Sequence, residues 1–195
     1  KYCNHTGCDG EYDIISDEIT ISVRGNEISS ASDLSKLNNS SDVFELTTDI
    51  DLAGVVFTPI KGFSGVLDGK GHTIKNLTIS STDSNVGFFS ILNGTVTNLN
   101  FENASVTVSG SNENVGVLCG SMQGMASNIM VAGAVNASSS NYVGGIIGFI
   151  STQNSFSINN LENKADISGA NYIGGVIGYC YTNTTSSSVV VQLSN

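Results

Sequence analysis

A ten-residue phrase occurs twice in the chain, and this repetition constrains the fold more than any other feature. The phrase "NYVGGIIGFI" begins at Asn141, and "NYIGGVIGYC" begins at Asn171, 30 positions later. Related versions occur earlier, as "SNVGFFS" at 84–90 and "ENVGVLCG" at 113–120. The shared glycines lie 29, 28 and 30 residues apart, at Gly87, Gly116, Gly144 and Gly174. Internal repeats of this length are typical of stacked architectures, in which each repeat covers its neighbour.

A second marker, an asparagine followed by an aliphatic residue, recurs in phase with the glycines. It stands at Asn98-Leu99, Asn128-Ile129 and Asn160-Leu161, with Asn76-Leu77 upstream. The segments between the markers carry β-branched residues and turn formers, without helical periodicity. The sequence therefore predicts an all-β right-handed parallel β-helix of six or seven stacked coils. At one corner, the marker asparagines would form an amide ladder, and Asn76 would be a poor glycosylation site if it belonged to that ladder.

The first part of the chain differs from the repeats and predicts a cap. The segment 30–39, "SASDLSKLNN", indicates a single short helix, with Ser32 or Asp33 as its N-cap and with Leu34 and Leu37 on one face. The alternating stretch "ITISV" at 19–23 predicts a strand. We therefore expect a lead-in over 1–30 and a β-helix over 31–195.

The repeats resemble those of the GLUG-motif family. The phrases "VGGIIG" and "IGGVIG" match the motif, and the segment 30–79 resembles the lead-in that commonly precedes it. The similarity covers about residues 30–180 and departs from the family at Lys61, where glycine is usual, and at "VGFFS", which lacks the second glycine. The resemblance implies a right-handed parallel β-helix in secreted or surface-attached proteins, often as a stalk or an adhesive module. It brings no catalytic residues.

The charge balance excludes two classes of partner. Acidic residues outnumber basic ones by 17 to 7, the net charge is −10, and Arg24 is the single arginine. Nucleic acids and anionic membranes both require clustered lysine and arginine. No apolar run reaches the roughly 18 residues of a membrane-spanning helix. The first ten residues lack the apolar stretch of a signal peptide, and the final "VVVQLSN" has no terminating feature, which favours a fragment of a longer protein.

Cysteines and sequons favour an extracellular location. Cys3 and Cys8 bracket a polar loop and are candidates for a small disulfide, with a metal half-site as the alternative. Cys119 and Cys180 lie in apolar phrases, which predicts two buried thiols too far apart to pair. The sequons that we consider candidates for glycosylation are those at Asn4, Asn39, Asn93, Asn103, Asn136 and Asn183.

Few residues suggest catalysis. Asp49 and Asp51 lie on the same side of a strand, as a glycosidase pair would, although exposed or turn-capping roles suit them better. Asp68 and His72 are a candidate acid–base pair, but "DGKG" between them is itself a turn sequence. A structural Ca²⁺ ion is an alternative use of the acidic residues, and a polysaccharide lyase would also need a basic residue. We expect no enzymatic activity and no cofactor.

Two further features indicate a binding or assembly role. Asn141, Tyr142, Asn171 and Tyr172 would stack at one corner of adjacent coils, and such a ladder suits glycan binding as well as simple stacking. The phenylalanines Phe88, Phe89, Phe149 and Phe156 are expected in the core or at corners. An open last coil would join another module or another subunit, since unpaired strand edges recruit partners. The sequence thus predicts a non-enzymatic structural or adhesive module of a cell-surface protein or filament. Carbohydrate binding is the alternative, and a polysaccharide lyase or glycoside hydrolase is a third hypothesis that the sequence favours less.

Overall fold

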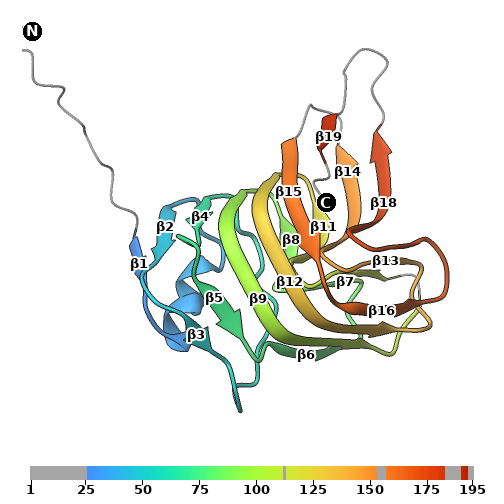
Figure 1. Ribbon diagram of the computed structural model, residues 1–195, viewed down its shortest axis with the longest axis horizontal. Helices are drawn as coiled ribbons and strands as arrows, with labels where there is room; N and C mark the ends of the chain where they lie inside the picture. The colour runs from blue at the N-terminus through green and yellow to red at the C-terminus, as the bar shows by residue number, and fades with distance from the viewer. Residues whose placement is uncertain (1–25, 112, 153–156, 183–189, 193–195) are drawn as a thin grey trace, which may run out of the picture.

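A computed structural model shows a parallel β-solenoid preceded by one short helix (Figure 1). The structure describes residues 26–111, 113–152, 157–182 and 190–192. The predicted strand at 19–23 and most of the predicted lead-in lie outside these residues. All pairings between the described strands are parallel, and the predicted all-β parallel fold is confirmed.

The strands form three stacks. The largest stack contains β1 (Asn26–Ile28), β2 (Val43–Leu46), β4 (Val66–Asp68), β9 (Thr95–Val108), β12 (Met125–Ala137), β15 (Ser157–Asn163) and β19 (Val190–Gln192), with β3 (Ile50–Asp51), β5 (Thr73–Lys75), β6 (Thr78–Ser81) and β16 (Asp166–Gly169) joined to it. The second stack contains β7 (Asn85–Val86), β10 (Asn114–Val115), β13 (Tyr142–Gly144) and β17 (Ile173–Gly174). The third stack contains β8 (Phe89–Leu92), β11 (Cys119–Met122), β14 (Ile147–Thr152) and β18 (Ile177–Thr182).

Four complete turns are present in the described part of the chain. They begin at Val66, Thr95, Met125 and Ser157, which lie in register with one another. Seven strands stack on the face that contains β1 and β19, but only four stack on each of the other two faces. The prediction of six or seven coils is therefore wrong for complete turns. The count fails because the first strands are short and separated by the helix and by loops, which the glycine markers do not reveal.

The long strands turn corners without a break in pairing. β9 pairs in succession with β4, β5 and β6 of the preceding turn, so one strand passes two corners within the largest stack. The two corners within β9 fall at Asn98 and Asn103, whose φ values are 54° and 53°. Asparagine enters this left-handed region more readily than other residues with a side chain. This preference explains why asparagine marks each turn in the sequence.

The core is an apolar column that changes composition along the stack. In the first turns it contains stacked phenylalanines, with the ring centroids of Phe63 and Phe89 5.2 Å apart and both side chains fully buried. Phe88 is also fully buried, as expected for the first repeat. One turn later the position of Phe89 is taken by Cys119, and two turns later by Ile147. At this position the core thus changes from an aromatic side chain to smaller ones as the chain proceeds.

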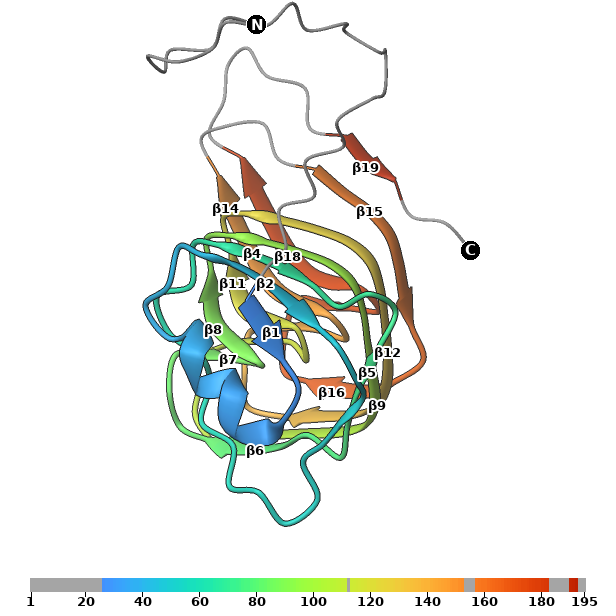
Figure 2. The ribbon, with the colours of Figure 1, turned by 90° about the vertical axis from the view of Figure 1, so that its left-hand side faces the viewer.

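A 3₁₀ helix, η1 (Ala31–Leu37), lies at the N-terminal end of the stack (Figure 2). Leu34 and Leu37, which were predicted to share one face of the helix, are both buried in the core. The predicted N-cap is wrong, because the cap is Ser30, whose Oγ accepts a hydrogen bond from the backbone N–H of Asp33. The carboxylate of Asp33 instead accepts from the Ser29 N–H and the Ser30 hydroxyl. The three-residue spacing of the leucines suits the 3₁₀ geometry, in which residues i and i+3 share a face.

Candidate functional site

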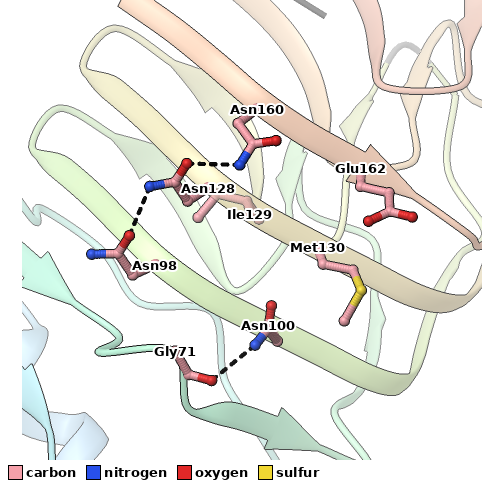
Figure 3. A pocket seen from close by; sticks show the side chains of 8 residues that line it. All are labelled: Gly71, Asn98, Asn100, Asn128, Ile129, Met130, Asn160 and Glu162. Atoms are coloured by element: carbon pink, nitrogen blue, oxygen red, sulfur yellow. Dashed lines mark hydrogen bonds between the residues drawn. The ribbon is translucent and has the colours of Figure 1, made fainter. Parts of the chain in front are cut away.

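The corner asparagines form a continuous hydrogen-bonded ladder across four turns (Figure 3). The Nδ2 of Asn160 donates to the Oδ1 of Asn128, and the Nδ2 of Asn128 donates to the Oδ1 of Asn98, both at 2.8 Å. The Nδ2 of Asn98 then donates to the Oδ1 of Asp68 at 2.9 Å. Asn98 and Asn128 each accept from the following turn and donate to the preceding one, whereas Asp68 only accepts. The predicted ladder is confirmed, and its first member is an aspartate.

A second ladder follows the next corner, and Asn76 belongs to this one. The Nδ2 of Asn103 donates to the Oδ1 of Asn76, and the Nδ2 of Asn76 donates to the Oδ1 of Asp51, both at 2.7 Å. The ladder ends after Asn103 because the following turn passes this corner with Gly133, at φ 148°, through an irregularity in the pairing. Both ladders therefore begin at an aspartate, and both run along left-handed corners.

The aspartate at the start of each ladder acts as a hydrogen-bond acceptor. Asp51 accepts from Asn76 and from the Ala53 N–H, which lowers the pKa of its carboxyl. Burial alone would raise the pKa of Asp68, but hydrogen bonds from Asn98 and from Lys70 outweigh it, and the pKa is lowered. A carboxylate suits this position because it can receive several donors at once.

The candidate acid–base residues have structural partners. His72 does not pair with Asp68; its Nδ1 lies 3.3 Å from the Oδ1 of Asp49. Asp49 also forms an ion pair with Lys75 at 3.0 Å and accepts from the Thr73 N–H. Lys75, followed by these hydrogen bonds, lowers the pKa of Asp49 to about 2. Asp49 and Asp51 are both exposed beside buried Ile50, as the strand pattern predicts.

A shallow groove of about 300 Å³ runs beside the first ladder. It is lined by Gly71, Asn98, Asn100, Asn128, Ile129, Met130, Asn160 and Glu162. Figure 3 shows these residues along β9, β12 and β15, except Gly71, which lies between β4 and β5. The Nδ2 of Asn100 donates to the carbonyl of Gly71 at 3.0 Å. Glu162 at its far end is paired with Lys164 at 2.9 Å. Within the described part of the chain, no three His, Cys, Asp or Glu side chains gather in an arrangement that would hold a metal ion.

Four aromatic rings cluster on the outside of the last two turns. Tyr142 and Tyr172 stack with their centroids 5.3 Å apart, as the repeat predicts. Tyr179 lies 5.2 Å from Tyr142 and 5.8 Å from Phe149. Tyr172 is 57% exposed and has a φ of 30°, which is strained for a residue with a large side chain. The sequence identified the tyrosine pair but not the contributions of Tyr179 and Phe149.

The asparagines next to the tyrosines also form a ladder. The Nδ2 of Asn171 donates to the Oδ1 of Asn141 at 2.6 Å. In the two preceding turns, Asn114 and Asn85 occupy the column of Tyr142, and the Nδ2 of Asn114 donates to the Oδ1 of Asn85 at 2.7 Å. The structure therefore brings together all four residues of the predicted tyrosine and asparagine ladder. Phe149 is half-buried beside them, and Phe156 lies outside the described residues.

Two predictions on modification and cysteines are affected by the geometry. Asn39, Asn93 and Asn136 are exposed, whereas the Nδ2 of Asn103 is a donor in the second ladder. Cys119 is buried as predicted, and burial raises the pKa of its thiol, but Cys180 is exposed. Asn4, Asn183 and the Cys3–Cys8 pair lie outside the described residues.

No helix among the described residues has the length and apolar character needed to cross a bilayer.

No family model matches the chain. The sequence is 33% identical over 159 residues to halomucin from Haloquadratum walsbyi, a match that covers 67% of this chain and 2% of that protein. The fold is similar to a crystal structure of a candidate immunoglobulin A1 protease from Bacteroides ovatus, with a TM-score of 0.54 and 20% identity over 81% of this chain and 62% of that one. The chain is therefore a β-solenoid domain that is similar in sequence to a small piece of halomucin and in fold to this protease candidate.

Proposed function

We propose that this chain is a structural or adhesive module of an extracellular or cell-surface protein and has no enzymatic activity. The observation that carries the proposal is that the polar corner residues are used to join turns. Both ladders hold successive turns together through hydrogen bonds of 2.7 to 2.9 Å. The carboxylates best placed for chemistry are those of Asp49, Asp51 and Asp68. Their pKa values are lowered by hydrogen bonds within the fold. General acid catalysis at neutral pH would need a raised carboxyl pKa.

The match to halomucin supports a modular role. The matched segment makes up only 2% of that protein. A rigid solenoid is a suitable building unit for a very long chain, since each turn contacts only its neighbours. The resemblance to GLUG-motif repeats, which accompany surface proteins, agrees with this role.

The assembly state of the purified chain tests the structural proposal. Light scattering and negative-stain electron microscopy over a concentration series would report its mass and shape. Rods or filaments would identify a self-assembling subunit, whereas a monomer would favour an adhesive module. Hydrolysis or elimination of a polysaccharide by the purified chain, abolished when Asp49 is changed to asparagine, would refute the proposal.

A second candidate function, glycan binding, is favoured by the aromatic cluster. Stacked rings next to an amide ladder offer a sugar both an apolar face and planar hydrogen-bonding groups. Tyr172 has a strained backbone and its side chain is 57% exposed, so one ring of this cluster is accessible to a ligand.

A paired substitution tests glycan binding. We expect Tyr142→Ala with Tyr172→Ala to lower retention on a glycan array at least about tenfold, a loss of roughly 1.4 kcal/mol in binding free energy. The matched control is Tyr181→Ala, because Tyr181 is another exposed tyrosine of the last turn, with 48% of its side chain accessible. Equal retention by the double variant and the parent chain would exclude this site.

A further inference from the structure

The last turn of the solenoid presents core positions to solvent. Val86, Val115 and Val143 occupy one column of register partners and are fully buried, but their partner in the last turn, Ile173, is 51% exposed. A second column shows the same change. Leu92, Met122 and Ile150 are fully buried, and their partner Cys180 is exposed. We call the surface formed by Ile173, Gly175, Val176, Ile177 and Cys180 the terminal face.

This geometry explains why the prediction of a buried Cys180 is wrong. The residue occupies a core column, as its apolar neighbours in the sequence indicate. Partial burial against the preceding turn raises the pKa of its thiol. Cys180 is exposed because no further turn covers its core column, and not because its side chain points away from the core.

Glycine 175 carries a separate indication. In the preceding turn, a Cβ on Gly145 would lie 2.4 Å from the carbonyl oxygen of Gly175, so glycine there makes room for the next turn. One turn earlier the same position is Val117, which is fully buried, so a larger side chain is also accepted here beneath a following turn. No atom of the described residues lies within 4 Å of a Cβ on Gly175, and its φ is not left-handed. Gly175 therefore leaves open the space that the carbonyl of the next turn takes up at Gly145.

The described chain also begins that further turn. β19 pairs in parallel with β15, with Val190, Val191 and Gln192 opposite Ser157, Ile158 and Asn159. The opposite end of the stack is covered by η1, whose leucines enter the core (Figure 2). Within the described residues, β17 and β18 end their stacks, so growth by the same parallel pairing is open beyond them (Figure 1).

We propose that the terminal face is the acceptor for one further turn of the same repeat, continuing from β19 in the parent polypeptide. This turn covers Ile173 and Cys180 and places a backbone carbonyl against Gly175. A second copy of this chain is a poorer occupant, because its N-terminal end is covered by η1 and because two terminal faces in contact would not reproduce the parallel register. The inference rests on the proposed structural role and assigns the partner of its open end.

An extended chain tests the proposal. Residues 193–195 are replaced by a copy of the sequence 160–182, so that the added turn continues in register from Gln192, with serine in place of the copied cysteine. We expect iodoacetamide to label Cys180 readily in the parent chain and at least about tenfold more slowly in the extended chain. Peptide mapping by mass spectrometry separates the four cysteines, and buried Cys119 provides the internal control.

Glycine substitutions make the test specific. Gly175→Ala should leave the melting temperature of the parent chain unchanged, but should restore rapid labelling of Cys180 in the extended chain. Gly145→Ala, the matched variant, should lower the melting temperature of both chains, because its Cβ meets the side chain of Asn163 and the carbonyl of Gly175.

Two results would overturn the inference. The first is equal labelling of Cys180 in parent and extended chains that share the same circular dichroism and melting temperature. The second is a parent chain that is dimeric by light scattering and already protects Cys180, since the occupant would then be a second copy. Neither result bears on whether the module is an enzyme or binds glycans, so the proposed function is judged separately by its own assays.

Discussion

At the residue scale, the corner asparagines perform two tasks with one side chain. Their backbones take left-handed φ values of 51° to 57°, which most residues with a Cβ avoid. Their amides offer a donor and an acceptor in one plane, so that each can join the turn before to the turn after. A residue with an amide but no tolerance of left-handed φ values would strain the backbone at the corner. A residue with that tolerance but no amide would leave the amides of the neighbouring turns unpaired.

Substitutions at Asn128 separate these two contributions. We expect Asn128→Ala to lower the free energy of unfolding by about 2 to 4 kcal/mol, because it loses two hydrogen bonds and strains the corner. Asn128→Gly should cost about 1 kcal/mol less, because glycine adopts the left-handed conformation without strain. Urea denaturation followed by circular dichroism measures both values. Equal losses for the two variants would show that the backbone conformation contributes nothing.

The two aspartates that begin the ladders, together with Asp49, predict a loss of stability in acid. Asp49, Asp51 and Asp68 have pKa values below the ordinary 3.8 in the folded protein. Groups of this kind stabilise the fold fully above the unfolded pKa, and this contribution is lost as the pH falls through the folded pKa. The urea midpoint should therefore fall between about pH 4 and about pH 2, the latter being the folded pKa of Asp49. Asp49→Asn should lower the midpoint at pH 7 and make this fall shallower, whereas an unchanged slope would remove Asp49 from the explanation.

The sequence predicted the asparagine ladder but not the residues that begin it. Asp68 precedes Asn98 by 30 residues, the same interval that separates Asn98 from Asn128, so the signal was present in the spacing. It was missed because Asn76-Leu77 matches the repeated dipeptide and Asp68-Gly69 does not. A carboxylate can replace the terminal amide because the first member of a ladder needs only to accept.

At the element scale, η1 covers one end of the core with two leucines and is fixed by a cap. The hydroxyl of Ser30 accepts from the Asp33 N–H, and the Asp33 carboxylate accepts from the Ser29 N–H and the Ser30 hydroxyl. Lys36 pairs with the same carboxylate at 2.7 Å. These contacts hold the pKa of Asp33 well below its ordinary value.

Substitution of the cap residue tests this arrangement. We expect Ser30→Ala to destabilise the protein by about 1 kcal/mol. The control Ser32→Ala changes the exposed serine that the sequence favoured as a cap, and it should cost less than about 0.5 kcal/mol. Thermal and urea denaturation of the two variants would compare them directly. A larger loss of stability for Ser32→Ala than for Ser30→Ala would show that Ser30 is not the capping residue.

The elements also show where sequence reasoning stops. The period of about 29 residues was enough to predict parallel turns, because each repeat must cover the apolar edge of its neighbour. The number of complete turns was not predictable from it, since β2 and β3 carry neither the glycine nor the asparagine marker. The outer aromatic cluster was only half visible, because Phe149 and Tyr179 meet Tyr142 across a corner and not along the repeat.

At the scale of the whole molecule, the ladders divide the surface into positions that can and cannot carry a glycan. N-glycosylation uses the side-chain nitrogen of asparagine, which the ladder members already use as a donor. Asn93 and Asn136 are exposed, whereas the Nδ2 of Asn76 and of Asn103 donates within the second ladder.

Expression in a glycosylating host tests this division. We expect glycans at Asn93 and Asn136 and none at Asn76 or Asn103, as measured by mass spectrometry after enzymatic deglycosylation in heavy-oxygen water. The exposed Asn39 sequon provides a further positive position. Full occupancy of Asn103 in the folded protein would contradict the ladder geometry.

The regular offset between turns has a consequence for how the chain folds. Register partners in successive complete turns are separated by about 30 residues throughout, from Val66 and Thr95 to Met125 and Ser157. Each turn therefore closes a loop of similar length, and the entropic cost of closure does not grow as turns are added. A solenoid built in this way can wind from its helix-covered end while synthesis continues, so its folding rate per turn should be independent of the length of the finished protein.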